Sequence, residues 1–192
     1  MQIILNTIAL EPNRWTEGKV PYFQLEDLLE PIAEAGFESL ELWQNHIALR
    51  EPGEVKGLCE QAESLGIVVP IVGMYPLFHL EGEDRRAELE RLEGMVEKMD
   101  LLDADILKLM PGRVASNDLT PELWERSVGF MREAIDRTED SDVIFTLETH
   151  GGTVADEPDA LERFLEDVDS DRLEVCWQPY DFASTGRAIK LF

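Results

Sequence analysis

Short apolar runs alternate with longer amphipathic segments along this chain, and no other feature constrains its fold as strongly. Six runs rich in branched residues are too short for helices and predict strands. They lie at residues 3–5, 40–43, 67–72, 106–110, 143–148 and 173–177. The segments between them carry apolar residues three and four positions apart, such as Val55, Leu58 and Ala62, which predicts helices with one buried face. This alternation is typical of an α/β fold with parallel strands joined by helical crossovers.

Residues that begin and end helices support these boundaries. Thr120 before a proline predicts an N-cap, and Asp156 predicts another. Gly36 and Gly66 lie directly before strands, where a glycine commonly terminates a helix. Pro31 lies inside the first helical pattern, and we expect a kink there because proline cannot donate a backbone hydrogen bond.

Two architectures fit this pattern, a doubly wound open sheet and a (β/α)₈ barrel of the TIM type. The predicted strands begin about 34 residues apart on average, so eight units need about 270 residues, close to the ~250 of a typical barrel. The 192 residues end after the sixth strand, in what is expected to be the middle of a sixth helix. We therefore predict a single domain over residues 1–192, a TIM-type barrel of about six β/α units that is C-terminally incomplete.

The charge of the chain excludes some functions. Asp and Glu number 41 against 17 Lys and Arg, for a net charge of −24, which disfavours binding to nucleic acid or to anionic membranes. Only five of the basic residues are Lys, and a salt-rich cytoplasm tolerates such an excess of carboxylates because salt screens their repulsion. We expect a halophilic source, with an ordinary acidic protein as the alternative. Two cysteines and no basic, apolar leader predict a reduced, cytoplasmic protein.

Polar residues near the carboxyl ends of the predicted strands are the candidates for a site, because ligands bind there in both architectures. Glu148 ends a mostly apolar strand, where a carboxylate is costly unless it is paired or bound to a cation. It is a candidate metal ligand or general base; the alternative is a solvated carboxylate just past the strand. Lys108 lies within an apolar run and is a candidate to polarise a substrate oxygen; the alternative is an ion pair with Glu148 or Glu41.

Five further residues are weaker candidates. His150 and His46 could act as ligands or proton shuttles, or be ordinary polar loop residues. Arg113 could hold an anionic group, and Trp43 and Tyr75 could wall a pocket against a sugar ring. Core packing is the alternative for Trp43, and a surface position is the alternative for Arg113.

Several of these segments resemble the xylose isomerase-like TIM barrels, a superfamily of sugar phosphate isomerases and epimerases that also includes endonuclease IV. The segments are residues 37–43 with His46, 104–108 and 146–156, and residues 175–179 fit a subgroup with Trp-Gln-Pro after the sixth strand. The resemblance covers essentially the whole chain, as the first six β/α units. It implies proton transfer beside a carbonyl, with Glu148, Lys108 and His150 as catalytic residues.

The resemblance also implies a divalent metal, Mn or Mg, held by a Glu, an Asp, a His and a Glu that follow strands five to eight. Glu148 matches the first ligand. Gln178 stands at the second position, with Asp181 three residues later, and an amide is a weaker ligand for a hard cation. The other two ligands would lie beyond Phe192. The implied substrate is a sugar or sugar phosphate, bound by the remaining candidates, which are His46, Trp43, Tyr75 and Arg113.

Alternatives to an active enzyme follow from the missing units, because an open barrel leaves two sheet edges uncovered. The chain could be truncated, or it could close by pairing with a second copy as a homodimer. It could also be a catalytically inactive remnant of the fold that binds sugar or forms oligomers. An abasic-site nuclease shares the fold, but the net charge of −24 disfavours it.

Overall fold

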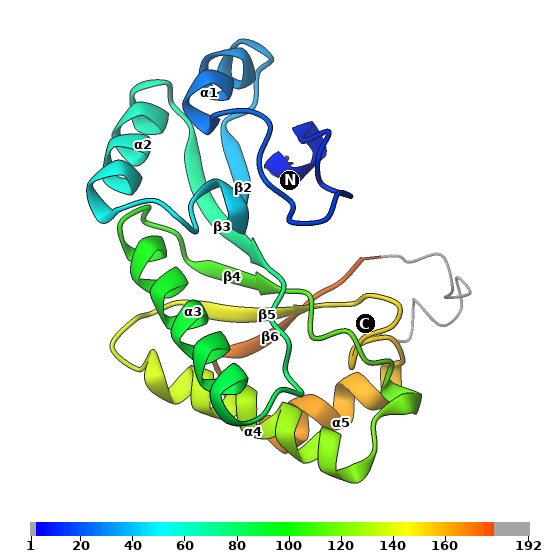
Figure 1. Ribbon diagram of the computed structural model, residues 1–192. Helices are drawn as coiled ribbons and strands as arrows, with labels where there is room; N and C mark the ends of the chain where they lie inside the picture. The colour runs from blue at the N-terminus through cyan, green and yellow to red at the C-terminus, as the bar shows by residue number, and fades with distance from the viewer. Residues whose placement is uncertain (1–2, 179–192) are drawn as a thin grey trace. The chain divides into compact units, whose positions relative to one another are not determined.

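The computed structural model describes residues 3–178, and it contains the predicted strands and the helices between them (Figure 1). The strands are β1 (Leu5–Asn6), β2 (Ser39–Trp43), β3 (Val68–Met74), β4 (Ile106–Leu109), β5 (Ile144–Glu148) and β6 (Leu173–Cys176). The α-helices are α1 (Leu25–Glu34), α2 (Pro52–Ser64), α3 (Gly82–Asp100), α4 (Pro121–Arg137) and α5 (Pro158–Val168). Short 3-10 helices, η1 (Thr7–Leu10), η2 (Gln44–His46) and η3 (Ser116–Asp118), follow β1, β2 and β4.

The strands form one six-stranded sheet in the order β1-β2-β3-β4-β5-β6. Strand β1 pairs with β2, β2 with β3, and β5 with β6, each in parallel. Within residues 3–178 the sheet does not close on itself. The prediction of a parallel α/β fold with six strands is therefore confirmed.

The chain divides into two compact units. The first comprises Met1–Gly73 and Met95–Ile106, and it contains β1, β2, most of β3, α1 and α2. The second comprises Met74–Gly94 and Leu107–Phe192, and it contains most of β4, with β5, β6, α4 and α5. Each unit has its own buried apolar residues.

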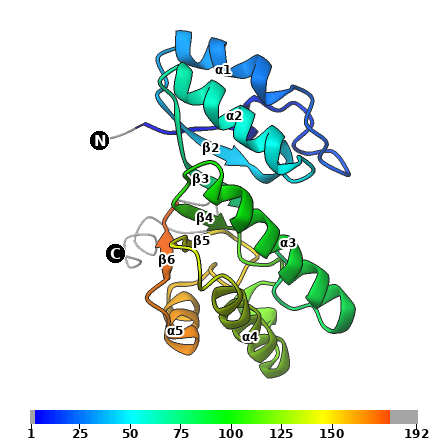
Figure 2. The same cartoon turned by 90° about the vertical axis from the view of Figure 1, so that its left-hand side faces the viewer.

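The core of the first unit lies between β2 and its two helices. Figure 2 shows α1 and α2 side by side over one face of β2. Leu40 and Leu42 of β2 are fully buried, and so are the apolar stripes of the helices. These stripes consist of Leu25, Leu29 and Ile32 in α1 and of Val55, Leu58 and Ala62 in α2. Because alternate strand residues face opposite sides, Ser39, Glu41 and Trp43 lie on the other face of β2.

Aromatic rings make up much of the core of the second unit. The ring of Phe78 stacks on Phe130 of α4 at 5.2 Å and on Phe164 of α5 at 6.1 Å. Trp124 meets Phe164 edge-on at 5.7 Å, which joins α4 to α5, and Figure 2 shows these two helices side by side. Phe145 of β5 is also fully buried. This packing fixes β5, whose end carries the main candidate residue.

The helix starts test two of the sequence predictions. The Thr120 hydroxyl accepts a hydrogen bond from a backbone N–H in the first turn of α4, so the predicted N-cap is confirmed. The prediction for Asp156 is wrong, because Glu157 is the N-cap residue of α5. Asp156 instead accepts a hydrogen bond from the backbone N–H of Ser116, 40 residues earlier, with which the sequence pattern could not associate it. Helix α1 includes Pro31, as the helical pattern indicated, and the kink expected there stays a prediction.

None of the helices between residues 3 and 178 is both long and apolar enough to cross a lipid bilayer.

Candidate functional site

A salt bridge joins the ends of β4 and β5 in the second unit. Nζ of Lys108 lies 3.0 Å from Oε2 of Glu148, and the two side chains are only 14% and 12% exposed. Their strand neighbours Leu107, Leu109 and Leu147 are fully buried. Because side chains alternate along a strand, Lys108 and Glu148 occupy the sheet face opposite these leucines. The structure thus brings together the two strongest candidates, in the ion pair that was the sequence alternative for Lys108.

The pair places a proton acceptor next to a cation. Burying a charge costs free energy because the charge leaves water, and each charge of the pair offsets part of this cost for the other. A lone carboxylate on this strand would have no such compensation. A carboxylate can take a proton from carbon when a nearby group stabilises the negative charge that forms. An ammonium group with three N–H donors can supply that stabilisation at a substrate oxygen. The geometry therefore suits proton transfer beside a carbonyl group.

Thr149 ties the end of β6 to the end of β5. Its hydroxyl donates to the backbone carbonyl of Gln178 and accepts from the backbone N–H of the same residue, both at 2.8 Å. Glu148 is paired in register with Cys176, two residues before Gln178. Glu148 and Gln178, the two predicted metal ligands, therefore lie at the ends of neighbouring strands.

The described residues do not fit a divalent metal by themselves. Hard cations such as Mg²⁺ and Mn²⁺ require several oxygen ligands, most of them carboxylates or water. Glu148 and Gln178 offer one carboxylate and one amide, and the Lys108 ammonium group already contacts that carboxylate. Residues 3–178 contain no cluster of three or more His, Cys, Asp or Glu side chains suited to a metal. Asp181 lies outside the described residues.

Three other predicted residues lie in loops of the second unit. His150 follows β5, and its Nδ1 is 2.8 Å from the carbonyl oxygen of Gly151, to which it donates. Tyr75 is half-buried after β3, and Arg113 is exposed after β4. The loops follow the carboxyl ends of the strands, as predicted, and the catalytic or binding roles of these residues stay predictions.

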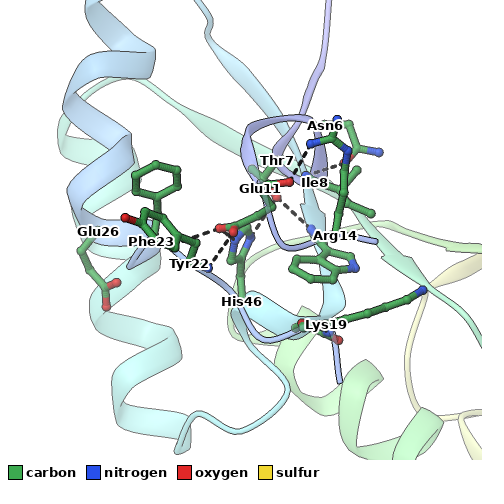
Figure 3. A network of polar contacts seen from close by, with 12 residues as sticks. Asn6, Thr7, Ile8, Glu11, Arg14, Lys19, Tyr22, Phe23, Glu26 and His46 are labelled. Atoms are coloured by element: carbon green, nitrogen blue, oxygen red, sulfur yellow. Dashed lines mark hydrogen bonds and ion pairs between the residues drawn. The ribbon is translucent and has the colours of Figure 1, made fainter. Parts of the chain in front are cut away.

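His46 is the centre of a buried network in the first unit (Figure 3). It ends η2, directly after β2. Its Nε2 lies 2.9 Å from Oε1 of Glu11, and its Nδ1 lies 3.0 Å from the Thr7 hydroxyl. Glu11 and Thr7 are fully buried, and His46 is 4% exposed. Trp43 meets the imidazole edge-on, with 5.6 Å between ring centroids.

Hydrogen bonds and burial together favour one protonation state of this network. An ionised carboxylate only accepts, so Nε2 of His46 donates to Glu11, and in the neutral ring Nδ1 then accepts from the Thr7 hydroxyl. Burial lowers the pKa of His46 by more than the Glu11 hydrogen bond raises it. Burial tends to raise the pKa of Glu11, but the hydrogen bonds from His46 and from the Tyr22 and Phe23 backbone outweigh it, so that this pKa is lowered. The network therefore holds a carboxylate beside a neutral imidazole.

The same network anchors the segment between η1 and α1. The Glu11 carboxylate accepts from the Tyr22 N–H at 2.7 Å and from the Phe23 N–H at 3.4 Å, and Figure 3 shows both residues beside it. His46 and Trp43 thus lie in the first unit, and their predicted substrate-binding roles stay predictions. Sequence reasoning missed Glu11 and Thr7. The available signal was an acidic residue at the end of an apolar stretch, Ile8 to Leu10.

Fold and site together define a parallel α/β protein with a charged pair at its strand ends. The family model of the xylose isomerase-like TIM barrel matches residues 29–190. The chain belongs to this family, so the resemblance and the predicted TIM-type fold class are confirmed. Comparison with curated proteins gives no match.

Solved structures share this fold at low sequence identity. D-psicose 3-epimerase from Clostridium cellulolyticum H10, determined with D-tagatose, has a TM-score of 0.79 at 17% identity, over 100% of this chain and 70% of its own. The probable 3-DHS dehydratase AsbF from Bacillus anthracis has a TM-score of 0.77 at 19% identity, over 92% of this chain and 62% of its own.

A xylose isomerase-like TIM barrel protein from Mycobacterium smegmatis, in complex with magnesium, has a TM-score of 0.69 at 16% identity. This match covers 91% of the chain and 63% of the Mycobacterium protein. The chain therefore spans less than two thirds of the length of two of these three relatives. At such identities the likeness shows the fold alone.

Proposed function

We propose that this protein is a sugar isomerase or epimerase in which Glu148 transfers a proton at the carbon beside a carbonyl group. The observation that carries the proposal is the 3.0 Å contact between Lys108 and Glu148 at the ends of two parallel strands. Membership of the xylose isomerase-like family supports it, as does the shared fold with a ketose epimerase. The substrate would be a ketose or a ketose phosphate.

The proposed chemistry needs a base and a stabilising cation. Lys108 donates a hydrogen bond to the carbonyl oxygen, and Glu148 takes the proton from the neighbouring carbon. The C–H electron pair forms an enediolate, whose negative oxygen stays beside the Lys108 ammonium group. The hydroxyl proton of the deprotonated carbon then moves to the negative oxygen, and Glu148 returns the carbon-derived proton to the former carbonyl carbon, which gives the isomer with its carbonyl group shifted by one carbon. Epimerisation requires a second acid that delivers a proton to the opposite face, and we propose His150, which the resemblance implies as a catalytic residue, for this role.

A divalent Mn or Mg ion is a further prediction of the family resemblance. Such an ion would supply additional polarisation of the substrate oxygens. Glu148 and Gln178 are too few ligands to hold it, so no step of the proposed mechanism depends on it. Tyr75 and Arg113, which lie in the same unit as Glu148, stay predicted contacts to the sugar, with Arg113 as the group suited to a phosphate. The predicted roles of His46 and Trp43 are not part of this proposal.

The proposal is tested by product analysis with D-psicose and D-tagatose. We expect the wild-type protein to convert at least one of them, and Glu148→Gln to lower the rate by about 10²–10⁴-fold, because the amide cannot accept the proton. Glu166→Gln, an exposed position on α5, is the control and should leave the rate unchanged. Full activity in Glu148→Gln would contradict the proposal. Binding of sugar without conversion would favour the alternative of an inactive sugar-binding protein.

A further inference from the structure

Strand β5 carries a second polar side chain beside the charged pair. Thr146 precedes Glu148 by two residues, so the two side chains point to the same face of the sheet. Thr146 is 7% exposed. Its hydroxyl finds no hydrogen-bond partner within residues 3–178. The proposed site therefore contains a buried hydroxyl for which residues 3–178 supply no hydrogen-bond partner.

Among the buried threonines of the described chain, only Thr146 lacks a hydrogen-bond partner, and the other such buried side-chain atoms are Ser39 Oγ and Trp43 Nε1. Thr7, Thr138, Thr149 and Thr153 all have hydrogen-bonded hydroxyls. A buried polar atom without a partner lowers the stability of the fold, and such atoms in native proteins call for a specific explanation. Valine fits the same space without that penalty. A hydroxyl at position 146 is explained if a ligand, rather than the protein, supplies its partner.

We propose that Thr146 is a specificity-determining residue, whose hydroxyl hydrogen-bonds a hydroxyl group of the substrate held by Lys108 and Glu148. This inference rests on the proposed function and extends it. Positions 146 and 148 lie about 6.6 Å apart along the strand. A substrate that reaches both needs a chain of at least three carbons, with its carbonyl group at Lys108 and a hydroxyl further along. The site thus selects polyhydroxy carbonyl compounds over simple ketones and aldehydes.

The test is Thr146→Val, which replaces the hydroxyl with a methyl group of similar size. Without ligand we expect the unfolding temperature to rise by about 2 °C, because the unpaired hydroxyl is gone. The dissociation constants of D-psicose and D-tagatose, measured by calorimetry, should increase about tenfold. Thr146→Ser keeps the hydroxyl and should restore wild-type binding.

Thr149→Val is the matched control. It removes a hydroxyl that bonds both the N–H and the carbonyl of Gln178, so its unfolding temperature should fall. The inference is wrong if the unfolding temperature of Thr146→Val falls as much as that of Thr149→Val. It is also wrong if Thr146→Val binds both sugars as tightly as the wild type. Measuring binding in a Glu148→Gln background separates the two proposals. Binding that depends on Thr146 without wild-type turnover overturns the proposed reaction alone, whereas absence of sugar binding by the wild type overturns both.

Discussion

Glu148 and Glu11 are two buried carboxylates that the fold stabilises differently. Glu148 meets a cation, Lys108, and keeps 12% of its side chain exposed. Glu11 is fully buried and accepts hydrogen bonds from a neutral imidazole and from two backbone N–H groups. The first arrangement leaves a base beside an ammonium group that can contact a substrate oxygen. In the second arrangement, groups of the protein itself supply the hydrogen bonds to the carboxylate, so we interpret Glu11 as a structural residue.

Removal of the Glu11 carboxylate should destabilise the first unit. Glu11→Ala leaves the Nε2 proton of His46 and the Tyr22 N–H without their acceptor, which we expect to cost about 2–4 kcal/mol of unfolding free energy. Urea denaturation measures the difference. Glu17→Ala, an exposed position in the same segment, is the control and should change stability by less than about 0.5 kcal/mol. Equal effects of the two substitutions would contradict the structural role.

The His46 network should make stability depend on pH. The pKa of His46 is lowered from its ordinary 6.5, so at acidic pH the unfolded chain binds a proton that the folded chain resists. The unfolding free energy should therefore fall as the pH drops below about 6.5. The lowered pKa of Glu11 adds a second loss below its ordinary 4.5.

His46→Gln isolates the first of these two losses. Glutamine can still donate to Glu11 but does not titrate. The unfolding free energy of the variant, measured by urea denaturation, should therefore change less between pH 6.5 and 5 than that of the wild type. If the unfolding free energies of the two proteins fall by the same amount over this pH interval, His46 does not cause the loss.

Single residues were predictable from sequence only where the local pattern was informative. Glu148 and Lys108 interrupt apolar strands, so their cost of burial was visible in the sequence. Glu11 was missed because its partner, His46, lies 35 residues away. The unpaired hydroxyl of Thr146 was also invisible, because threonine is common in strands and only the fold reveals which hydroxyls lack a partner.

At the level of elements, apolar periodicity predicted the strands and most helix faces, while their ends depended on tertiary contacts. Strand β1 is Leu5–Asn6 rather than residues 3–5, and Asp156 bonds to a distant loop instead of capping α5. The two glycine signals are confirmed, because Gly36 and Gly66 adopt φ of +85° and +73° just after α1 and α2. Only glycine adopts this conformation without strain.

Two glycine substitutions should have opposite effects on stability. Gly36→Ala places a Cβ atom in the left-handed conformation after α1 and should cost about 1–2 kcal/mol. Gly57→Ala lies inside α2 with open space around it, and it should add about 0.5–1 kcal/mol because alanine loses less entropy in a helix. Thermal unfolding measures both. A stabilising Gly36→Ala would show that the chain avoids this turn.

For the whole molecule, alternation and spacing predicted the parallel α/β fold, and the match to the TIM barrel family confirms it. The division into two compact units was not predictable, since it reflects the density of contacts between distant segments rather than any local pattern. For the same reason the sequence could place candidates at strand ends, but it could not show that Lys108 pairs with Glu148.

The net charge of −24 predicts a response to salt. Repulsion among carboxylates opposes the compact state, and molar KCl reduces the screening length to about 3 Å. We expect the unfolding temperature to rise steadily between 0.1 and 2 M KCl if the protein is halophilic. A temperature that falls with added KCl would contradict the halophilic origin.

Deuterium uptake tests the central claim most directly, because it reports proton transfer at carbon without requiring a known product. D-psicose is incubated with the protein in D₂O, and NMR follows the hydrogens on the carbons beside the carbonyl group. The account predicts that the wild-type protein exchanges one of these hydrogens for deuterium and that Glu148→Gln does so at least about 100-fold more slowly. Equal exchange by both proteins, or a wild-type protein that shows neither deuterium uptake nor sugar conversion, would contradict it.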